Sequence, residues 1–368
     1  MVSNKPNSSV VETALHKGAQ GERLTLEEGD ALVSLFTPQG ISRLQEAARE
    51  NRERRYSNRA TYVHNIQVNP SNICEGTCRF CEYRAREGDA HAYVLDEASI
   101  LTKIDALAPT EVHIVGGMNR LWSFERNRAL IQAIRAQFPT MHIKAYTAVE
   151  IDYFARKSGH SVETVLFKLK EAGLNALPGG GAELFSKRIR KRFCPDKLSA
   201  EGWLTVHKMA HRFGISTNGT MLFGLGESAE ELVAHMAQIR SAEDEAPGFS
   251  CFIPLPFQPG PNGDVLASPP PLQTLGIIAL ARLLLDNVPH IKAYWPMIGL
   301  ETASCALSFG ADDLDGTIGE ERIAHAAGAL TPKALSREKM ETTIRFGGYT
   351  PVERDGAFNE VTPRGDAS

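Results

Sequence analysis

Short apolar runs alternate with amphipathic stretches over most of this 368-residue chain, and no other feature constrains its fold as strongly. The apolar runs have the length of buried strands, and the stretches between them have the periodicity of helices. Each spacer is long enough for the crossover that two parallel strands need. The pattern predicts strands at 64–68, 111–115, 142–147, 175–177, 216–223, 249–255 and 290–296. It predicts helices at 127–137, 161–172, 200–213, 229–239 and 271–285.

Seven strands that alternate with helices favour an α/β fold, a (β/α) barrel that is complete or partly open. Residues 310–318 could supply an eighth strand or an active-site loop. We expect a tail and a helical extension over residues 1–60, the barrel over 61–320, and a C-terminal extension that closes the barrel over 321–368. The first ten and last ten residues are polar or rich in Pro and Gly, which predicts disorder.

Composition excludes several classes of partner. A net charge of −4 and a pI near 6.3 give no general attraction to nucleic acid or to an anionic membrane. A basic run at 51–59 is interpreted as a solvated helix end, because no aromatic residues extend it. No apolar segment is long enough to span a bilayer, and the start lacks the apolar core of a signal peptide. We therefore expect a cytoplasmic protein, and the oligomeric state cannot be predicted.

Three cysteines form a C-x3-C-x2-C triplet directly after the first predicted strand: Cys74, Cys78 and Cys81. Three thiolates can bind three irons of a 4Fe–4S cluster and leave the fourth iron open, whereas electron-transfer clusters usually have four cysteine ligands. A zinc site would need a fourth Cys or His at short spacing, and none follows. The triplet indicates an open cluster, with a zinc or metal-free site as the alternative. Cys194, Cys251 and Cys305 are expected to be buried structural thiols.

Further motifs follow the predicted strands, where the functional groups of such barrels lie. Gly116 and Gly117 close the second strand, and glycines there let the backbone approach a ligand. Glu150, after the third strand, could bind a ligand or cap the next helix. Glycines at 179–181 could expose N–H groups to an anion, although no P-loop sequence follows. Asn218 is a polar position within an apolar strand and needs a partner if buried.

These motifs together resemble one branch of the radical S-adenosylmethionine (SAM) superfamily. The branch contains aminofutalosine synthase, cyclic dehypoxanthine futalosine synthase and the deazaflavin-forming enzymes. The resemblance is carried by the cysteine triplet, 144–150, 177–183, 249–257 and a C-terminal block at 290–295, 309–317 and 351–355. The C-terminal block looks like the synthase. Residues 116–120, 224–228 and 252–259 depart from the usual synthase pattern, and the last segment partly resembles the cyclase.

The resemblance implies a 4Fe–4S cluster at the triplet, with SAM as a substrate. It implies addition of the 5′-deoxyadenosyl radical to 3-[(1-carboxyvinyl)oxy]benzoate, which gives 6-amino-6-deoxyfutalosine, methionine and bicarbonate in menaquinone biosynthesis. A hydrogen-abstracting cyclase is the alternative, and an iron–sulfur scaffold, which would need a fourth ligand, is a third hypothesis. The residues expected near SAM are Tyr83, Gly116, Gly117, Glu150, Gly179, Gly180 and Asn218.

Two kinds of partner follow from the implied reaction. One is the small-molecule substrate, a dianion that needs cationic or amide groups. Lys144, His290, Lys292 and Arg354 are candidates by their location. The other partner is an electron donor such as flavodoxin or ferredoxin, because the cluster must be reduced. No catalytic residue is assigned from the sequence.

Overall fold

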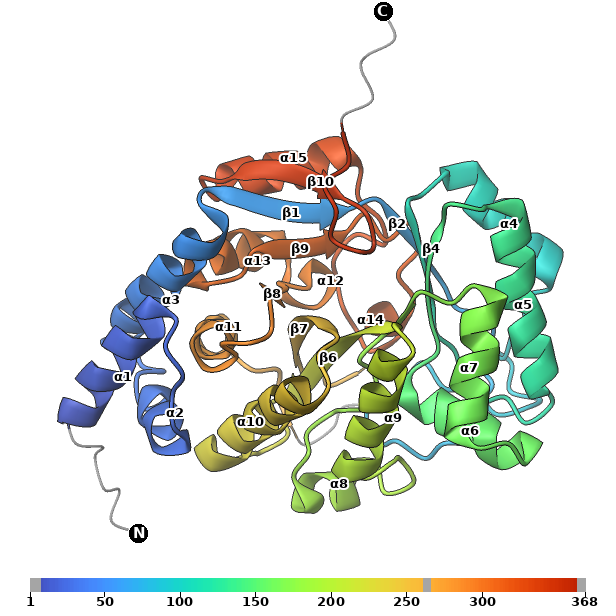
Figure 1. Cartoon of the computed structure of the whole chain (residues 1–368), viewed down its shortest axis with the longest axis horizontal. Coiled ribbons are helices and arrows are strands. Elements are labelled where there is room, and N and C mark those ends of the chain that lie inside the picture. The colour runs from blue at the N-terminus through green and yellow to red at the C-terminus, as the bar shows by residue number, and fades with distance from the viewer. Residues whose placement is uncertain (1–7, 261–265, 363–368) are drawn as a thin grey trace, which may run out of the picture.

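Seven parallel strands form one curled sheet in the computed structural model, which describes residues 8–260 and 266–362 (Figure 1). The order of the strands across the sheet is their order along the chain. They are β2 (Asn65–Val68), β3 (Glu111–Ile114), β4 (His142–Ala145), β5 (Ala176–Leu177), β6 (Ser216–Phe223), β7 (Phe249–Pro256) and β8 (His290–Ile291). The fold is the predicted one, a (β/α) barrel that is partly open.

Helices follow these strands and cover the outer face of the curled sheet (Figure 1). Those between β2 and β6 are α4 (Glu97–Leu107), α5 (Phe124–Gln137), α6 (Ala148–Ser158), α7 (Val162–Ala172), α8 (Lys187–Phe193) and α9 (Ala200–Arg212). Next come α10 (Ala229–Glu245) and α11 (Pro271–Leu284). Most start at a Ser, Thr or Asp whose side chain accepts the N–H three residues on, as Ser161 and Ser199 do.

A smaller parallel sheet lies between the two edges of the barrel sheet. Its order is β10 (Thr350–Arg354), β1 (Arg59–Val63) and β9 (Asp313–Gly316). The Ala293 N–H after β8 donates to the Asp313 carbonyl at 2.8 Å, and the Gln67 N–H of β2 donates to the Ile318 carbonyl at 2.9 Å. Residues 313–318 therefore bridge the gap between β8 and β2, so the predicted segment 310–318 supplies a strand.

Helices from both ends of the chain pack beside the barrel. The N-terminal ones are α1 (Ser8–Gln20), α2 (Leu26–Val33) and α3 (Ile41–Tyr56), and they contact α10 and α11 (Figure 1). The later ones are α12 (Trp295–Ile298), α13 (Leu300–Ala306), α14 (Ile323–Ala326) and α15 (Arg337–Phe346), with a 3-10 turn at Leu307–Phe309. The division into 1–60, 61–320 and 321–368 stays a prediction.

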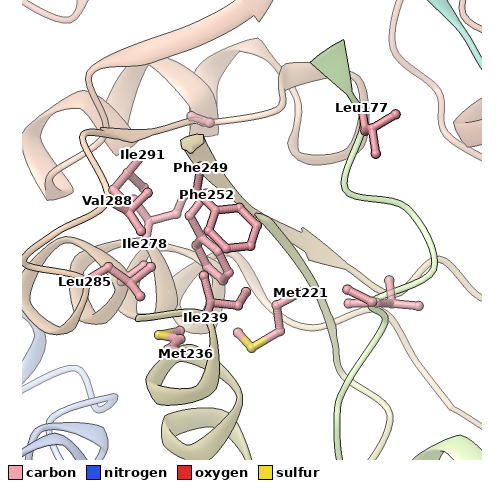
Figure 2. Close-up of a cluster of buried hydrophobic side chains, with 14 of the residues drawn as sticks. Leu177, Met221, Met236, Ile239, Phe249, Phe252, Ile278, Leu285, Val288 and Ile291 are labelled. Atoms are coloured by element: carbon pink, nitrogen blue, oxygen red, sulfur yellow. The ribbon is translucent and has the colours of Figure 1, made fainter. Parts of the chain in front are cut away.

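The main core lies between the sheet and its helices. Figure 2 shows Phe249 and Phe252 of β7 among side chains from α10 and α11, including Ile239 and Ile278. Phe252 is fully buried. A bulge at Ser250 shifts the register of β7, which lets Phe249 and Phe252 share the outer side of the sheet. Ile253, the next residue, points to the opposite side and faces the interior of the barrel. This alternation separates the apolar packing layer from the site described below.

Several sequence-based expectations about local structure are wrong. The strand predicted at 290–296 ends at Ile291, because Pro296 is the second residue of α12 and favours a helix start. Of the residues predicted to be disordered, 8–10 belong to α1, and Glu360 pairs with Arg354 of β10. Arg52 of the basic run is fully buried and donates to the carbonyls of Ala311, Ser57 and Arg59. Cys305 is exposed on α13.

Cys194 and Cys251 are buried, as predicted. Residues 1–7 and 363–368, where disorder was predicted, lie outside the described residues. Among residues 8–260 and 266–362, no helix has the length and apolar content that crossing a bilayer takes.

Candidate active site

A cavity of about 360 Å³ opens at the C-terminal ends of the barrel strands. Its polar lining comes from the cysteine triplet, from the turns after β3, β4 and β5, and from side chains inside the barrel. Its apolar lining includes Val115, Leu222, Ile253, Leu255 and Phe257. All seven residues predicted to lie near SAM line this cavity, together with Cys74, Cys78, Cys81 and Lys144.

The loop that carries the three cysteines is held by its own backbone and by two arginines. The Cys74 N–H donates to the Ala85 carbonyl at 3.0 Å, and Ala85 returns a bond to Asn72. Arg84 and Arg86 both donate to the carbonyl of Gly76, at 2.9 and 3.1 Å. The Cys74 sulfur accepts the N–H groups of Gly76 and Met118, both at 3.3 Å. One thiolate thus already has two backbone donors.

The turn after β3 lies against this loop. A Cβ added to Gly117 would lie 2.2 Å from the Ile73 carbonyl oxygen and 2.8 Å from the Cys74 Cβ. Gly117 also donates its N–H to the Ser71 carbonyl at 2.9 Å. The second glycine of this turn is therefore required by contact with the cysteine loop, before any ligand is considered.

Glu150 caps a helix, as one of its two predicted roles requires, and its side chain also lines the cavity. As the third residue of α6, it forms a capping box with Thr147, whose N–H donates to Oε2 at 2.7 Å. Its other oxygen, Oε1, accepts the Gly116 N–H at 3.3 Å, and the side chain lines the cavity. Burial raises the pKa of Glu150 to about 7, although the hydrogen bonds from Thr147 and Gly116 act in the opposite direction.

The glycines at 179–181 bring three elements close together. A Cβ at Gly179 would lie 2.6 Å from the Asn218 carbonyl oxygen, and one at Gly180 would lie 2.9 Å from Thr147 Cγ2. The Thr220 hydroxyl donates to the Gly179 carbonyl at 2.6 Å. Glycine at these positions therefore lets the loop after β5 pack between β6 and the start of α6, with its backbone on the cavity.

The floor of the cavity is formed by polar side chains inside the barrel. Lys144 of β4 donates to Glu111 of β3 at 2.7 Å, and both side chains are buried. Burial alone would raise the pKa of Glu111, but the nearby cations, Lys144 first among them, together outweigh it and hold the pKa well below its usual range. His113 lies beside them with no partner for its buried Nε2 atom, and burial lowers its pKa to about 3. Gln67 and Asn218 complete this floor.

The other three predicted substrate cations do not line the cavity. Arg354 of β10 donates to both carboxylate oxygens of Asp313, at 2.5 and 3.0 Å. Lys292 lies 3.4 Å from an oxygen of Asp315, and His290 Nδ1 lies 2.6 Å from an oxygen of Asp312. Each of these cations has a carboxylate partner within the protein. Asp315 itself lines the cavity, so the segment predicted as strand or loop does both.

Two family models match this chain. Residues 68–239 match the family model of the radical SAM superfamily, and residues 246–363 match that of the CofH/MqnC C-terminal region. The aminodeoxyfutalosine synthase of Thermus thermophilus is 40% identical over 355 residues, which cover 94% of each chain.

The chain belongs to the radical SAM superfamily.

Two further proteins of known activity are similar to this chain, one in sequence and one in structure. A 5-amino-6-(D-ribitylamino)uracil–L-tyrosine 4-hydroxyphenyl transferase of Methanopyrus kandleri is 35% identical over 356 residues, 91% of this chain and 94% of that one. The crystal structure of methylornithine synthase superposes with a TM-score of 0.76 at 19% identity, covering 92% of this chain and 97% of that one. The second likeness shows the radical SAM fold alone.

Radical SAM enzymes use a 4Fe–4S cluster and SAM, and the cysteine loop has the donors that such a cluster needs. Cys74, Cys78 and Cys81 are free thiols on one loop, and all line the cavity. Within the described residues, no three His, Cys, Asp or Glu side chains are placed to hold a single metal ion. A cubane cluster makes a different demand, because its three cysteines bind three separate irons. The backbone N–H bonds to Cys74 fit a cluster thiolate, since such bonds tune iron–sulfur sites.

Sequence reasoning missed several charged residues of this radical SAM site, of which Lys197 is one. Lys197 is half-buried, pairs with Glu183 and lines the cavity, with Nζ 5.2 Å from the Phe80 ring centre. Burial would lower the pKa of Lys197, but the Glu183 carboxylate raises it above its usual range. Lys197 lies in a short connection between α8 and α9 and belongs to no motif. The glycine run that ends beside Glu183 was the one nearby signal.

The segments that depart from the usual radical SAM synthase pattern have structural partners. The Asn119 side-chain amide donates to the Ser71 hydroxyl at 3.2 Å and is buried. Glu227 accepts the N–H groups of Gly224 and Leu225, at 2.8 and 2.7 Å. Gln258 lines the cavity and donates to the Met297 carbonyl at 3.1 Å. Of the three segments, 116–120 and 252–259 both contribute residues to the cavity lining, and 224–228 does not.

Proposed function

We propose that this protein is an aminofutalosine synthase. In this reaction SAM, 3-[(1-carboxyvinyl)oxy]benzoate and water give 6-amino-6-deoxyfutalosine, methionine and bicarbonate, a step of menaquinone biosynthesis. The reduced cluster, with SAM bound, supplies the 5′-deoxyadenosyl radical that adds to the enol-ether double bond. The observation that carries the proposal is 40% identity to the Thermus thermophilus synthase over 94% of both chains.

We propose that the cavity residues bind and orient the two substrates. SAM would lie along Tyr83, Gly116–Gly117, Glu150, the backbone of 179–180 and Asn218, next to the cysteine loop. Those seven residues all line the cavity, and the Glu150 carboxylate is the acidic group among them. A carboxylate at this position suits the ammonium or ribose hydroxyls of SAM.

The benzoate would then occupy the barrel end of the same cavity. Its ring fits the apolar lining of Val115, Leu222, Ile253, Leu255 and Phe257, and its carboxylates fit the polar floor. Of the four predicted cations, we retain Lys144 for this role, because it alone lines the cavity. His290, Lys292 and Arg354 are proposed to support the floor through their aspartate partners. The enclosed walls hold the reactants together and exclude water from the radical.

The 35% identity to the hydroxyphenyl transferase names the competing substrate class, tyrosine with 5-amino-6-(D-ribitylamino)uracil. The reconstituted protein is therefore incubated without oxygen with SAM and dithionite, and offered either the benzoate or the tyrosine pair. Mass spectrometry identifies the product of each mixture. We expect aminofutalosine from the benzoate and no coupled product from the tyrosine pair. Coupling of tyrosine with an untouched benzoate would replace the proposed substrate and retain the radical SAM assignment.

The proposed reaction also indicates where the protein works and which partners it needs. We propose a reducing compartment, the cytoplasm, because reduced thiols and an iron–sulfur cluster persist there. The substrate is a small molecule, and the electron donor is a separate redox protein such as flavodoxin or ferredoxin.

A further inference from the structure

The short helix α8 is the most basic segment of the chain. Its seven residues, Lys187–Phe193, include five Lys or Arg and no acid, whereas the whole chain has 40 basic and 44 acidic residues. Four of the five basic side chains are exposed: Lys187, Arg188, Lys191 and Arg192. Such a concentration of one charge produces a local positive potential on a protein whose net charge is negative.

This helix lies directly against the cysteine loop. The Arg79 N–H, one residue after Cys78, donates to the carbonyl of Phe193 at 2.9 Å. The Thr77 hydroxyl donates to Asp196 in the connection that follows α8. Arg79 is exposed, so the cluster loop carries a cation at a residue whose backbone contacts α8. We call Arg79, Lys187, Lys191 and Arg192 the α8 basic face.

The helix is also fixed to the wall of the cavity. Arg190 is buried and points inward, donating to the carbonyls of Gly181, Ala182 and Leu198. Gly181 belongs to the glycine turn that lines the cavity. A partner that binds the outer side of α8 would thus be separated from the cluster loop and the cavity wall by a single layer of protein.

Few internal partners neutralise the α8 basic face. Arg188 is compensated, since it donates to both oxygens of Glu231. In the part of the chain that the structure describes, Arg79, Lys187 and Lys191 have no hydrogen bond or ion pair from their side chains, and Arg192 contacts the Phe193 ring alone. Asp196 is the exposed acid between the helix and the loop. Four cations against one carboxylate leave a net charge of about +3.

We propose that the α8 basic face is the docking surface for an acidic electron-transfer protein that reduces the cluster. The inference rests on the proposed function, because that function requires the cluster to be reduced. Electron-transfer partners form small, transient interfaces, and complementary charge raises their association rates. The exposed side of the seven-residue helix α8 suits a small interface of this kind, and α8 lies beside the cysteine loop that would hold the cluster. An acidic flavodoxin or ferredoxin has the complementary charge.

A nucleic acid is the competing occupant of a basic surface. Stable binding to nucleic acid takes several phosphate contacts along a groove or stripe, with aromatic stacking when the strand is single. The exposed residues of α8 include no aromatic side chain, because Phe193 is buried. The net charge of −4 would also oppose a polyanion outside this small face. Charge and location together favour the redox protein.

The test compares a protein donor with a small-molecule donor on the reconstituted enzyme. The variant is Lys187→Glu/Lys191→Glu, and the matched control is Lys333→Glu/Lys339→Glu. The control lysines are exposed at and just before α15, which lies at the opposite end of the molecule from α8 (Figure 1). Cluster reduction by reduced bacterial flavodoxin is followed by stopped-flow absorbance, and by SAM cleavage. Flavodoxin affinity for the protein without its cluster is measured by calorimetry at low and high salt.

We expect the α8 variant to lose about tenfold or more in the rate of cluster reduction by flavodoxin at low salt. Its flavodoxin affinity should fall in parallel, while dithionite reduces variant and unchanged protein equally. Equal flavodoxin rates and affinities in all three proteins would overturn the docking surface. So would duplex DNA binding that depends on Lys187 and Lys191 while flavodoxin reduction does not. If dithionite supports no SAM cleavage in the unchanged protein, the proposed function fails instead, and the calorimetry still decides the surface.

Discussion

The backbone of Gly117 lies so close to that of Ile73 that residue 117 has no room for a side chain. A Cβ there would be 2.2 Å from the Ile73 carbonyl oxygen, and the next residue, Cys74, donates its N–H to the Ala85 carbonyl. The turn after β3 and the cysteine loop thus form one packed unit, in which the Met118 N–H reaches the Cys74 sulfur. The geometry of the cysteines depends on a residue in another strand-end loop.

Gly117→Ala should therefore displace the cysteine loop. The added methyl would overlap backbone atoms, a kind of overpacking that costs about 1–3 kcal/mol. We expect a lower iron content after anaerobic reconstitution and a lower unfolding free energy, measured by denaturant titration. The control is Gly202→Ala in α9, where the nearest atom to a new Cβ is the end of Leu198 at 3.2 Å. Full iron content in Gly117→Ala would contradict the packing argument.

Each cysteine of the triplet should be required for the cluster. Changing Cys74, Cys78 or Cys81 to Ala removes the thiolate of one iron, so we expect loss of the 4Fe–4S absorbance and of SAM cleavage. Cys305→Ala is the control, because Cys305 is exposed on α13 and lies outside the cavity. Iron analysis and absorbance near the cluster band measure the outcome. A Cys78→Ala protein that keeps its cluster and cleaves SAM would sink the ligand assignment.

Glu150 should make stability depend on pH in a definite direction. Its pKa rises from an ordinary value of about 4.5 to about 7 on folding, because burial disfavours the carboxylate. Between these values the folded state binds more protons than the unfolded state, so the unfolding free energy falls as pH rises. The contribution of Glu150 is thus present below pH 4.5, and it is lost as pH approaches 7.

The matched variant is Glu150→Gln, which keeps the capping box because Gln also serves at this helix position. We expect the stability of the unchanged protein, relative to this variant, to decrease by up to about 3 kcal/mol between pH 4.5 and 7. Denaturant unfolding without SAM across this range measures it. A difference that stays constant with pH would mean that the carboxyl group titrates normally.

The buried ion pair between Arg354 and Asp313 should contribute strongly to the free energy of unfolding. Arg354 and Asp313 are both buried, and Arg354→Met leaves the carboxylate without its main partner. Removing one member of a buried ion pair typically costs about 3–5 kcal/mol. Arg337→Met removes the exposed partner of Glu353, for which we expect a change of about 1 kcal/mol or less. Chemical denaturation of both variants separates the two cases, and equal losses would show that burial does not set the cost.

Periodicity was sufficient to predict the barrel, because buried strands and amphipathic helices have different repeats. It was not sufficient at Trp295, where a proline in the first turn starts a helix within an apolar run. The strand β1 was missed since Arg59–Val63 pairs only with β9 and β10, both near the end of the chain. Sequence separation of this kind leaves no local signal.

In the candidate active site, too, local sequence signals could be recognised and long-range contacts could not. Cysteine spacing and strand-end glycines could be recognised because their chemistry is local in the sequence. The partners of Lys292 and Arg354 could not be recognised in this way. The sequence shows the aspartates as part of a motif, but it does not show that they lie beside these cations in the fold. Lys197 and His113 line the cavity through long-range folding alone. Charged residues near a predicted site are therefore the positions at which a structure changes the interpretation most.

The fate of the SAM 5′ carbon tests the central claim most directly. The protein, reconstituted and reduced with dithionite, is incubated with SAM labelled at that carbon and with 3-[(1-carboxyvinyl)oxy]benzoate, and the nucleosides are analysed by mass spectrometry. The account predicts that the label appears in 6-amino-6-deoxyfutalosine, with bicarbonate released and little free 5′-deoxyadenosine. Label found entirely in 5′-deoxyadenosine, with the benzoate unchanged, would contradict it.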